Sequence, residues 1–250
     1  MEFVRGPRQV ARAPQELLRG AALLRALAQS FSYPDPTHWR AVAAQLRRAK
    51  PCGRHLCDRT LRRSLANAER NWSEASIDAL RATYARLFLG NGPCPMRETA
   101  YGDARRMAGR AIDLADISGF YKAFGLRPSP LEPDLPDHLC SELEFCSWLL
   151  VKLAYAKQRR AAIKHRVTAR ALRAFLQDHL GRWPESFATE LRRNDGSSPY
   201  ARLAEVLAQA VRAEVRWAQA RPRPASPRNP ADPSLENQFE CPRPQEQGAK

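Results

Sequence analysis

Residues 131–153 read LEPDLPDHLCSELEFCSWLLVKL, and this stretch decides how the chain can fold. Pro133 and Pro136 restrict the start of the stretch to extended or turn conformations. After them, apolar side chains recur at helical spacing and form one stripe, at Leu139, Leu143, Cys146, Leu150 and Leu153. The stretch therefore predicts a hinge that leads into a long helix over residues 136–157.

Acidic side chains are concentrated in the same stretch. Residues 131–144 hold five carboxylates and no lysine or arginine, in a chain with 41 basic residues, 26 acidic residues and a formal net charge of +15. Asp134 is placed to cap the helix, and acids near a helix N-terminus are favoured by its dipole. Beside an apolar groove, the same carboxylates could instead bind the guanidinium groups of a peptide. The residues alone leave both interpretations open.

Helical periodicity continues on both sides of this stretch. Further helices are expected at residues 14–31, 37–50, 58–68, 76–89, 108–124, 168–180, 184–192 and 199–217. Ser73 or Ser76 is expected to cap the fourth helix. No segment shows the two-residue alternation of a strand. The expected fold class is all-α, a compact bundle of roughly eight to ten helices.

The chain is expected to divide into three parts. Residues 1–13 form a flexible N-terminus, residues 14–220 form the helical domain, and residues 221–250, with seven prolines and few apolar side chains, form a disordered tail. No apolar run approaches the length of a membrane span, and no export signal is recognised. We therefore expect a cytoplasmic protein with reduced thiols and no stable membrane association.

Two clusters of side chains are candidates for chemical sites. Cys52, His55 and Cys57 could begin a zinc site, but the other cysteines do not supply the ordered second pair of ligands, so no metal is predicted. His138 beside Asp137 could act as an acid or base. The sequence has no nucleophile elbow, phosphate loop or paired metal-ligand motif to accompany them. We expect neither enzymatic activity nor a bound cofactor.

The positive charge of the chain supports an alternative function, that of a basic helical protein that binds nucleic acid. Residues 152–173 carry eight lysines and arginines. The segment lacks the interleaved aromatic side chains and the glycine turn that would support this function. Its simpler interpretation is a solvated connection between two helices.

Four short motifs, in order along the chain, resemble those of the TorD/DmsD/NarJ family of molybdoenzyme-specific chaperones. They are Tyr84-x-x-Leu87-Phe88 before a Gly-Pro loop, PMRETAYGD at residues 95–103, SGFYKAFGL at residues 118–126, and LPDHLCSELEF at residues 135–145. The leucine before Pro-Asp-His is closer to the NarJ-like branch. The alternative is that this motif resembles chaperones of enzymes similar to selenate, chlorate, dimethylsulfide or ethylbenzene oxidoreductases.

The resemblance implies an all-helical cytoplasmic chaperone. Similar proteins bind the immature catalytic subunit of a molybdenum-cofactor oxidoreductase of the DMSO reductase superfamily, many of them through its twin-arginine signal peptide. They assist cofactor insertion and assembly before export. By position, Pro136, Asp137 and His138 match the family's hinge residues, and Glu142 matches the acid that follows them.

A client-binding site follows from these matches and from the acidic stretch. Asp137 and His138 are expected to contact the client, and the remaining acids are expected to supply negative potential. The expected site comprises Glu132, Asp134, Pro136, Asp137, His138 and Glu142, with Tyr101, Tyr121 and Trp148 as groove residues.

Overall fold

The computed structural model describes residues 12–37, 39–49, 59–102, 107–127 and 135–226. Within these ranges the chain forms nine α-helices, one short 3-10 helix and no strand, which confirms the all-α prediction. The elements are α1 (Pro14–Ser30), α2 (Trp39–Arg48), α3 (Arg59–Glu74), α4 (Ile77–Phe88), η1 (Glu98–Ala100), α5 (Met107–Ala123), α6 (Leu139–Gln158), α7 (Ala162–Asp178), α8 (Pro184–Asp195) and α9 (Pro199–Ala218). None of these helices is both long enough and apolar enough to cross a membrane.

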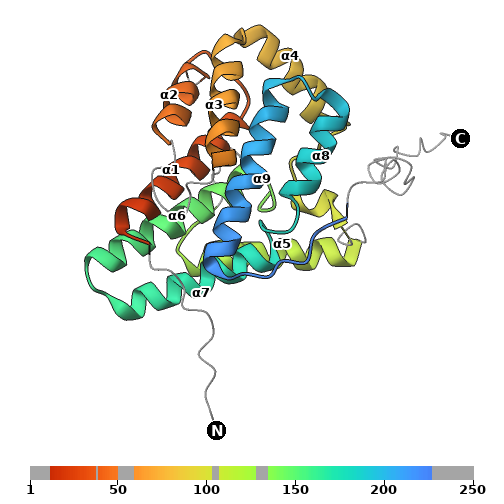
Figure 1. The fold of residues 1–250 in the computed structure, drawn as a ribbon. Helices are drawn as coiled ribbons and strands as arrows, with labels where there is room; N and C mark the ends of the chain where they lie inside the picture. The colour runs from red at the N-terminus through yellow and green to blue at the C-terminus, as the bar shows by residue number, and fades with distance from the viewer. Residues whose placement is uncertain (1–11, 38, 50–58, 103–106, 128–134, 227–250) are drawn as a thin grey trace, which may run out of the picture.

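Two long helices organise the packing (Figure 1). The helix α6 lies along α1 and continues through a tight turn into α7, which packs back against it. The helix α9 runs through the middle of the molecule and contacts α1, α3, α7 and α8. Because α6 and α9 are both covered by neighbours, they supply much of the core.

The apolar stripe predicted for α6 lies in that core. Leu139, Leu143, Cys146, Leu150 and Leu153 are all 0% exposed. Burying each leucine side chain is worth about 1.5–3 kcal/mol relative to leaving it in water. The stripe therefore fixes which face of α6 turns inward, and hence where the polar side chains of its first turn must lie.

Several helix limits differ from those expected. The helix α6 begins at Leu139 instead of residue 136, because the Nδ1 atom of His138 accepts a hydrogen bond from the Cys140 N–H at 3.3 Å and caps the helix. The helix α6 ends at Gln158 and α7 begins at Ala162, so most of the basic segment is helical and residues 159–161 alone connect the two helices. The expected cap Asp134 lies outside the described residues.

The ordered structure also extends past both expected ends of the helical domain. Arg12 is 1% exposed, and its Nη1 atom lies 2.6 Å from Oε2 of Glu214 on α9. At the other end Ala225 is buried and donates its N–H to the Arg182 carbonyl at 2.9 Å. Residues just outside the expected limits of 14 and 220 therefore pack against the helices. The rest of the expected flexible N-terminus and proline-rich tail lies outside the described residues.

Candidate functional site

The hinge before α6 is tied to the segment that carries η1. Arg97 and His138 form an isolated antiparallel bridge. On either side of it, the Glu98 N–H donates to the Asp137 carbonyl at 3.0 Å and the Leu139 N–H donates to the Met96 carbonyl at 2.9 Å. Two motifs that lie about forty residues apart in the sequence therefore share one set of backbone hydrogen bonds.

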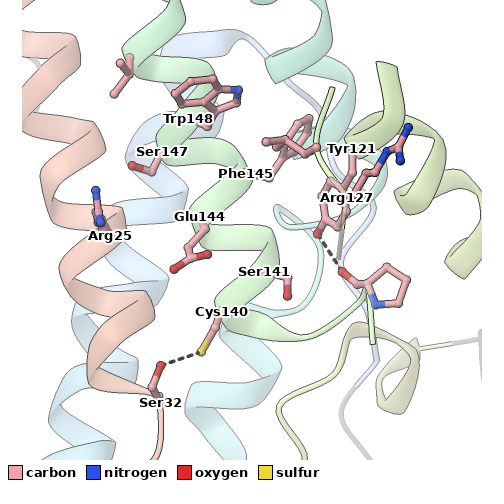
Figure 2. Close-up of a pocket in the computed structure, with 13 residues that line it drawn as sticks. Arg25, Ser32, Tyr121, Arg127, Cys140, Ser141, Glu144, Phe145, Ser147 and Trp148 are labelled. Atoms are coloured by element: carbon pink, nitrogen blue, oxygen red, sulfur yellow. Dashed lines mark hydrogen bonds between the residues drawn. The ribbon is translucent and has the colours of Figure 1, made fainter. Parts of the chain in front are cut away.

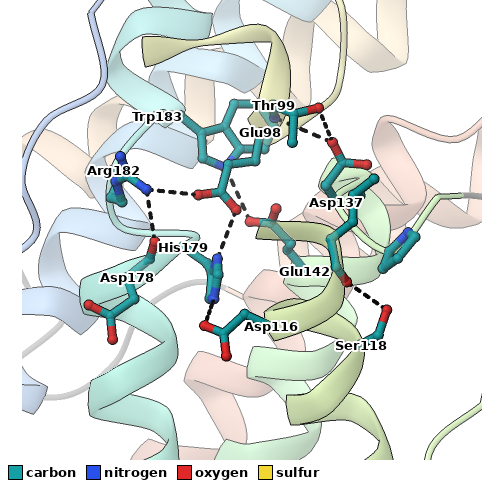
Figure 3. Close-up of polar contacts among 12 residues, drawn as sticks. Glu98, Thr99, Asp116, Ser118, Asp137, Glu142, Asp178, His179, Arg182 and Trp183 are labelled. Atoms are coloured by element: carbon teal, nitrogen blue, oxygen red, sulfur yellow. Dashed lines mark hydrogen bonds and ion pairs between the residues drawn. The ribbon is translucent and has the colours of Figure 1, made fainter. Parts of the chain in front are cut away.

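Asp137 strengthens this link from inside the protein. Its side chain is 0% exposed, and its Oδ2 atom accepts hydrogen bonds from the Thr99 hydroxyl at 2.6 Å and the Thr99 N–H at 3.3 Å (Figure 3). Asp137 is predicted from the sequence to contact a client directly. In this structure a client cannot reach the Asp137 carboxylate, because the η1 segment covers it.

Glu142, predicted to supply negative potential to the client site, is also buried. It is 0% exposed, and its Oε2 atom accepts a hydrogen bond from the Trp183 indole N–H at 3.1 Å. The Glu98 carboxylate, 3% exposed, is its buried neighbour, and its negative charge raises the pKa of Glu142. Two acidic side chains thus meet in the core, out of reach of a peptide's guanidinium groups.

His179 connects this carboxylate pair to the surface (Figure 3). Its Nδ1 atom lies 3.1 Å from Glu98 Oε2, and its Nε2 atom lies 3.0 Å from Oδ2 of the exposed Asp116. Arg182 adds a longer ion pair, with 3.6 Å between its Nη1 atom and Glu98 Oε1. No local sequence pattern predicts His179, Asp116 or Trp183 as site residues, because the fold brings together side chains from four separate helices and loops.

Burial and mutual repulsion set the protonation of this buried network. Burial raises the pKa of Glu142 well above its usual value, and the Glu98 carboxylate raises it further. Burial also raises the pKa of Glu98, against a lowering effect of His179. For His179, burial lowers the pKa, but hydrogen bonds to Glu98 and Asp116 outweigh it and the net shift is upward. The network therefore favours protonated forms.

A groove of about 580 Å³ also borders the hinge, and it lies between α1, α6 and the end of α5 (Figure 2). Its lining residues are Arg25, Ser32, Tyr121, Leu126, Arg127, Pro136, Cys140, Ser141, Glu144, Phe145, Ser147, Trp148 and Val151. Three of the expected site residues, Tyr121, Pro136 and Trp148, line it together. The Tyr121 hydroxyl donates to the Pro136 carbonyl at 2.8 Å, which fixes one wall of the groove against the hinge.

The charge of the groove differs from the expected acidic surface. Among the described residues that line the groove, Glu144 is the one carboxylate, and Arg25 and Arg127 are basic. Glu132 and Asp134 lie outside the described residues. Tyr101 was expected as a groove residue but does not line it, since it is 2% exposed and stacks on Trp183 in the core, with 5.4 Å between ring centroids.

The described residues contain no group of three or more histidine, cysteine, aspartate or glutamate side chains arranged to hold a metal ion. Cys52, His55 and Cys57 lie outside the described residues. In the described part of the chain, the hydrogen-bond partners of the buried acids include Thr99 for Asp137, His179 for Glu98 and Trp183 for Glu142.

Residues 54–189, which include the η1 segment, the hinge, the groove helix α6 and His179, match the protein family described as "Nitrate reductase delta subunit". The chain belongs to this family. The match confirms the resemblance to the NarJ-like branch of the maturation chaperones, and it spans the residues that build the hinge and the buried network.

Three proteins that are similar to this chain are named as assembly chaperones. The chain is 31% identical over 189 residues to the selenate reductase assembly chaperone protein of Thauera selenatis, across 75% of this chain and 83% of that protein. It is 30% identical over 190 residues to the chlorate reductase assembly chaperone protein of Ideonella dechloratans, across 74% and 82%. The perchlorate reductase assembly chaperone protein of Dechloromonas aromatica is 26% identical over 140 residues, across 56% and 62%.

Proposed function

We propose that this protein is an assembly chaperone for the catalytic subunit of a molybdenum-cofactor oxidoreductase of the DMSO reductase superfamily. It binds the immature subunit, including a twin-arginine signal peptide, in the cytoplasm and assists cofactor insertion before export. One observation carries the proposal: about three quarters of the chain aligns with two proteins named as reductase assembly chaperones, at 30–31% identity. It acts by binding and release, with no covalent step.

The groove beside α6 is the proposed client site. Trp148 is 41% exposed there, which is unusual for a large apolar side chain with room to pack, and Phe145 and Val151 extend the apolar wall. An apolar client segment can bury this surface, and large aromatic side chains carry much of the energy at such interfaces. Because α6 is buried along its other faces, it presents the wall without rearrangement.

Glu144 supplies the charge recognition in this proposal. Its carboxylate is exposed at the groove and can pair with one guanidinium group of a twin-arginine motif. Arg25 and Arg127 repel further cations and favour a client segment whose other charges are acidic. Asp137 and Glu142 contribute indirectly, by holding Pro136 and the start of α6 in place.

Affinity capture with a defined client tests the proposal. The tagged full chain is co-expressed with a molybdopterin-dependent catalytic subunit, either with or without its signal peptide, and the captured subunit is quantified. We expect capture of both forms, with less of the shorter one. Trp148→Ala and Glu144→Lys should each reduce capture about fivefold or more, as expected for an interface anchor and a reversed charge.

Tyr155→Ala is the matched control, because Tyr155 is an exposed aromatic residue on the same helix outside the groove. Its capture should equal that of the wild type. If the catalytic subunit never co-purifies, the proposed function is wrong. If Tyr155→Ala and Trp148→Ala lower capture equally, the groove is not the client site. Strong salt-dependent binding to duplex DNA would favour the alternative function.

A further inference from the structure

A second pocket of about 340 Å³ lies at the turn between α6 and α7, and it shares no lining residue with the client groove. Its lining residues are Arg12, Leu17, Ala156, Lys157, Arg160, Ala161, Ala162, His165 and Trp217. We propose that this pocket binds a phosphate group carried by a small apolar or aromatic molecule. The volume falls in the range of small-molecule sites, about 300–1,000 Å³.

A buried cation with unused donors is the first support. The Arg12 guanidinium is 1% exposed and lies over the Trp217 ring, with 4.3 Å between Cζ and the ring centroid. Its Nη1 atom contacts Glu214, but its Nε and Nη2 atoms have no hydrogen-bond partner. Buried N–H groups without acceptors are costly, and a phosphate oxygen is the kind of acceptor that guanidinium donors match best.

A helix N-terminus at the same pocket is the second support. The helix α7 is 17 residues long and begins at Ala162, and its cap residue Ala161 offers no side-chain hydrogen bond. No acidic side chain lies in the first turn of α7. The Ala162 N–H already donates to the Arg160 carbonyl at 3.1 Å, so what the helix offers an external anion is the positive end of its dipole, which no acidic side chain of the first turn offsets.

The charges around the pocket also favour an anionic ligand. Lys157, Arg160 and His165 line it with Arg12, and its described lining residues include no carboxylate. The Lys157 ammonium donates to the Arg12 carbonyl, which holds it at the pocket edge. Burial lowers the pKa of His165, and the charge of Lys157 lowers it further. The local potential is positive although Glu214 neutralises one of the cations.

The balance of charge and shape selects the ligand. With Glu214 paired to Arg12, the described lining residues still present a lysine, a second arginine and the helix N-terminus with no carboxylate among them, which favours a doubly charged phosphate over a singly charged carboxylate. The indole of Trp217 and the side chains of Leu17 and Ala156 form an apolar surface beside these charges. A phosphate ester with an apolar body can contact both the positive charges and this apolar surface.

Titration calorimetry of the full chain with phenyl phosphate tests the proposal. We expect saturable binding, weakened about fivefold by Arg160→Ala and by His165→Ala, because each removes one charged or polar partner of the phosphate. Arg166→Ala is the matched control, since it removes one exposed positive charge from the same helix outside the pocket. It should change the Kd less than about twofold.

The proton titration of His165, followed by NMR, gives a second readout. Bound phosphate adds negative charge beside the imidazole, so the pKa of His165 should rise when phenyl phosphate is present. Benzoate should bind more weakly than phenyl phosphate. The proposal is overturned if phenyl phosphate does not bind, if benzoate binds equally well, or if Arg166→Ala weakens binding as much as Arg160→Ala. None of these outcomes bears on client capture, which is measured separately.

Discussion

Asp137 joins the hinge to η1 through a buried hydrogen bond with the Thr99 hydroxyl. We expect Asp137→Ala to lower the free energy of unfolding by about 2 kcal/mol, because it leaves the Thr99 donors unsatisfied. In a double-mutant cycle with Thr99→Val, the coupling energy should be about 1–2 kcal/mol. Urea denaturation of the four proteins measures it.

This expectation differs from the interpretation of Asp137 as a client contact. Glu144→Ala is the control, because Glu144 is exposed and its loss should leave stability nearly unchanged. Should Asp137→Ala keep full stability and lose only client capture, a conformation in which the hinge opens and exposes the carboxylate would be required.

Glu142 makes stability depend on pH. Its folded pKa lies well above the unfolded value of about 4.3, because of burial and then the Glu98 carboxylate. The stability that this protonation supplies is complete below the unfolded pKa and is lost as pH rises through the folded pKa. Glu142→Gln keeps an acceptor for Trp183 and removes the titration. We therefore expect a flatter plot of unfolding free energy against pH between about pH 5 and 8.

Urea midpoints across this pH range check the prediction. Glu98 and His179, whose pKa values are also raised, still titrate in the same direction, so some slope should remain. Glu144→Gln should follow the wild type, since Glu144 is exposed. A Glu142→Gln plot as steep as that of the wild type would show that Glu142 is already ionised at low pH in the folded protein.

At the scale of elements, the start of α4 shows how one cap is chosen from two candidates. The Ser76 hydroxyl accepts the Ala79 N–H at 3.2 Å, whereas the Ser73 hydroxyl donates to Glu69 within α3. Ser76→Ala should cost about 1 kcal/mol of stability, and Ser76→Asp should retain most of it. Ser73→Ala should have little effect. Thermal denaturation of the three variants decides this, and equal losses for Ser73→Ala and Ser76→Ala would contradict it.

The helix α6 takes part in both the buried core and the proposed client site, because its different faces contact different parts of the protein. One face is the buried leucine stripe, and Glu142 on the first turn belongs to the buried network. Glu144 and Trp148 turn toward the client groove. A single helix therefore carries both the hydrogen bonds that fix the hinge and the surface proposed to bind the client.

At the scale of the whole molecule, residues 221–226 act as a strap across the loops beside η1 and α8. The Ser186 hydroxyl donates to the Ala225 carbonyl at 2.7 Å, and the Gly102 N–H donates to the Ser226 carbonyl at 3.1 Å. A chain that ends at residue 220 should lose about 2 kcal/mol relative to one that ends at residue 226, or about 4–8 °C in Tm.

Gly102→Ala tests the same contact without truncation. Gly102 has a φ of +72°, and an added Cβ would lie 3.1 Å from the Ala225 Cβ. We expect a loss of Tm in the full chain, from the strained backbone and the crowded strap. Scanning calorimetry measures both effects. If the chains ending at residues 220 and 226 melt at the same temperature, the strap contributes nothing to stability.

The sequence by itself determined the helical class, the approximate helix ranges and the membership in the maturation-chaperone family. These follow from local information: the spacing of apolar residues along one helix, and motifs whose residues are contiguous, such as residues 135–145. The stripe of α6 was predictable because each leucine takes its place from the period of the helix alone.

Only the tertiary structure decided which carboxylates face solvent. Asp137, Glu142 and Glu144 are similar in sequence context, but packing against the η1 segment and Trp183 buries the first two and leaves the third at the groove. His179 lies far along the chain from Glu98, and no local pattern connects them. Burial and long-range hydrogen bonds depend on contacts between elements, so the periodicity of any single segment cannot specify them.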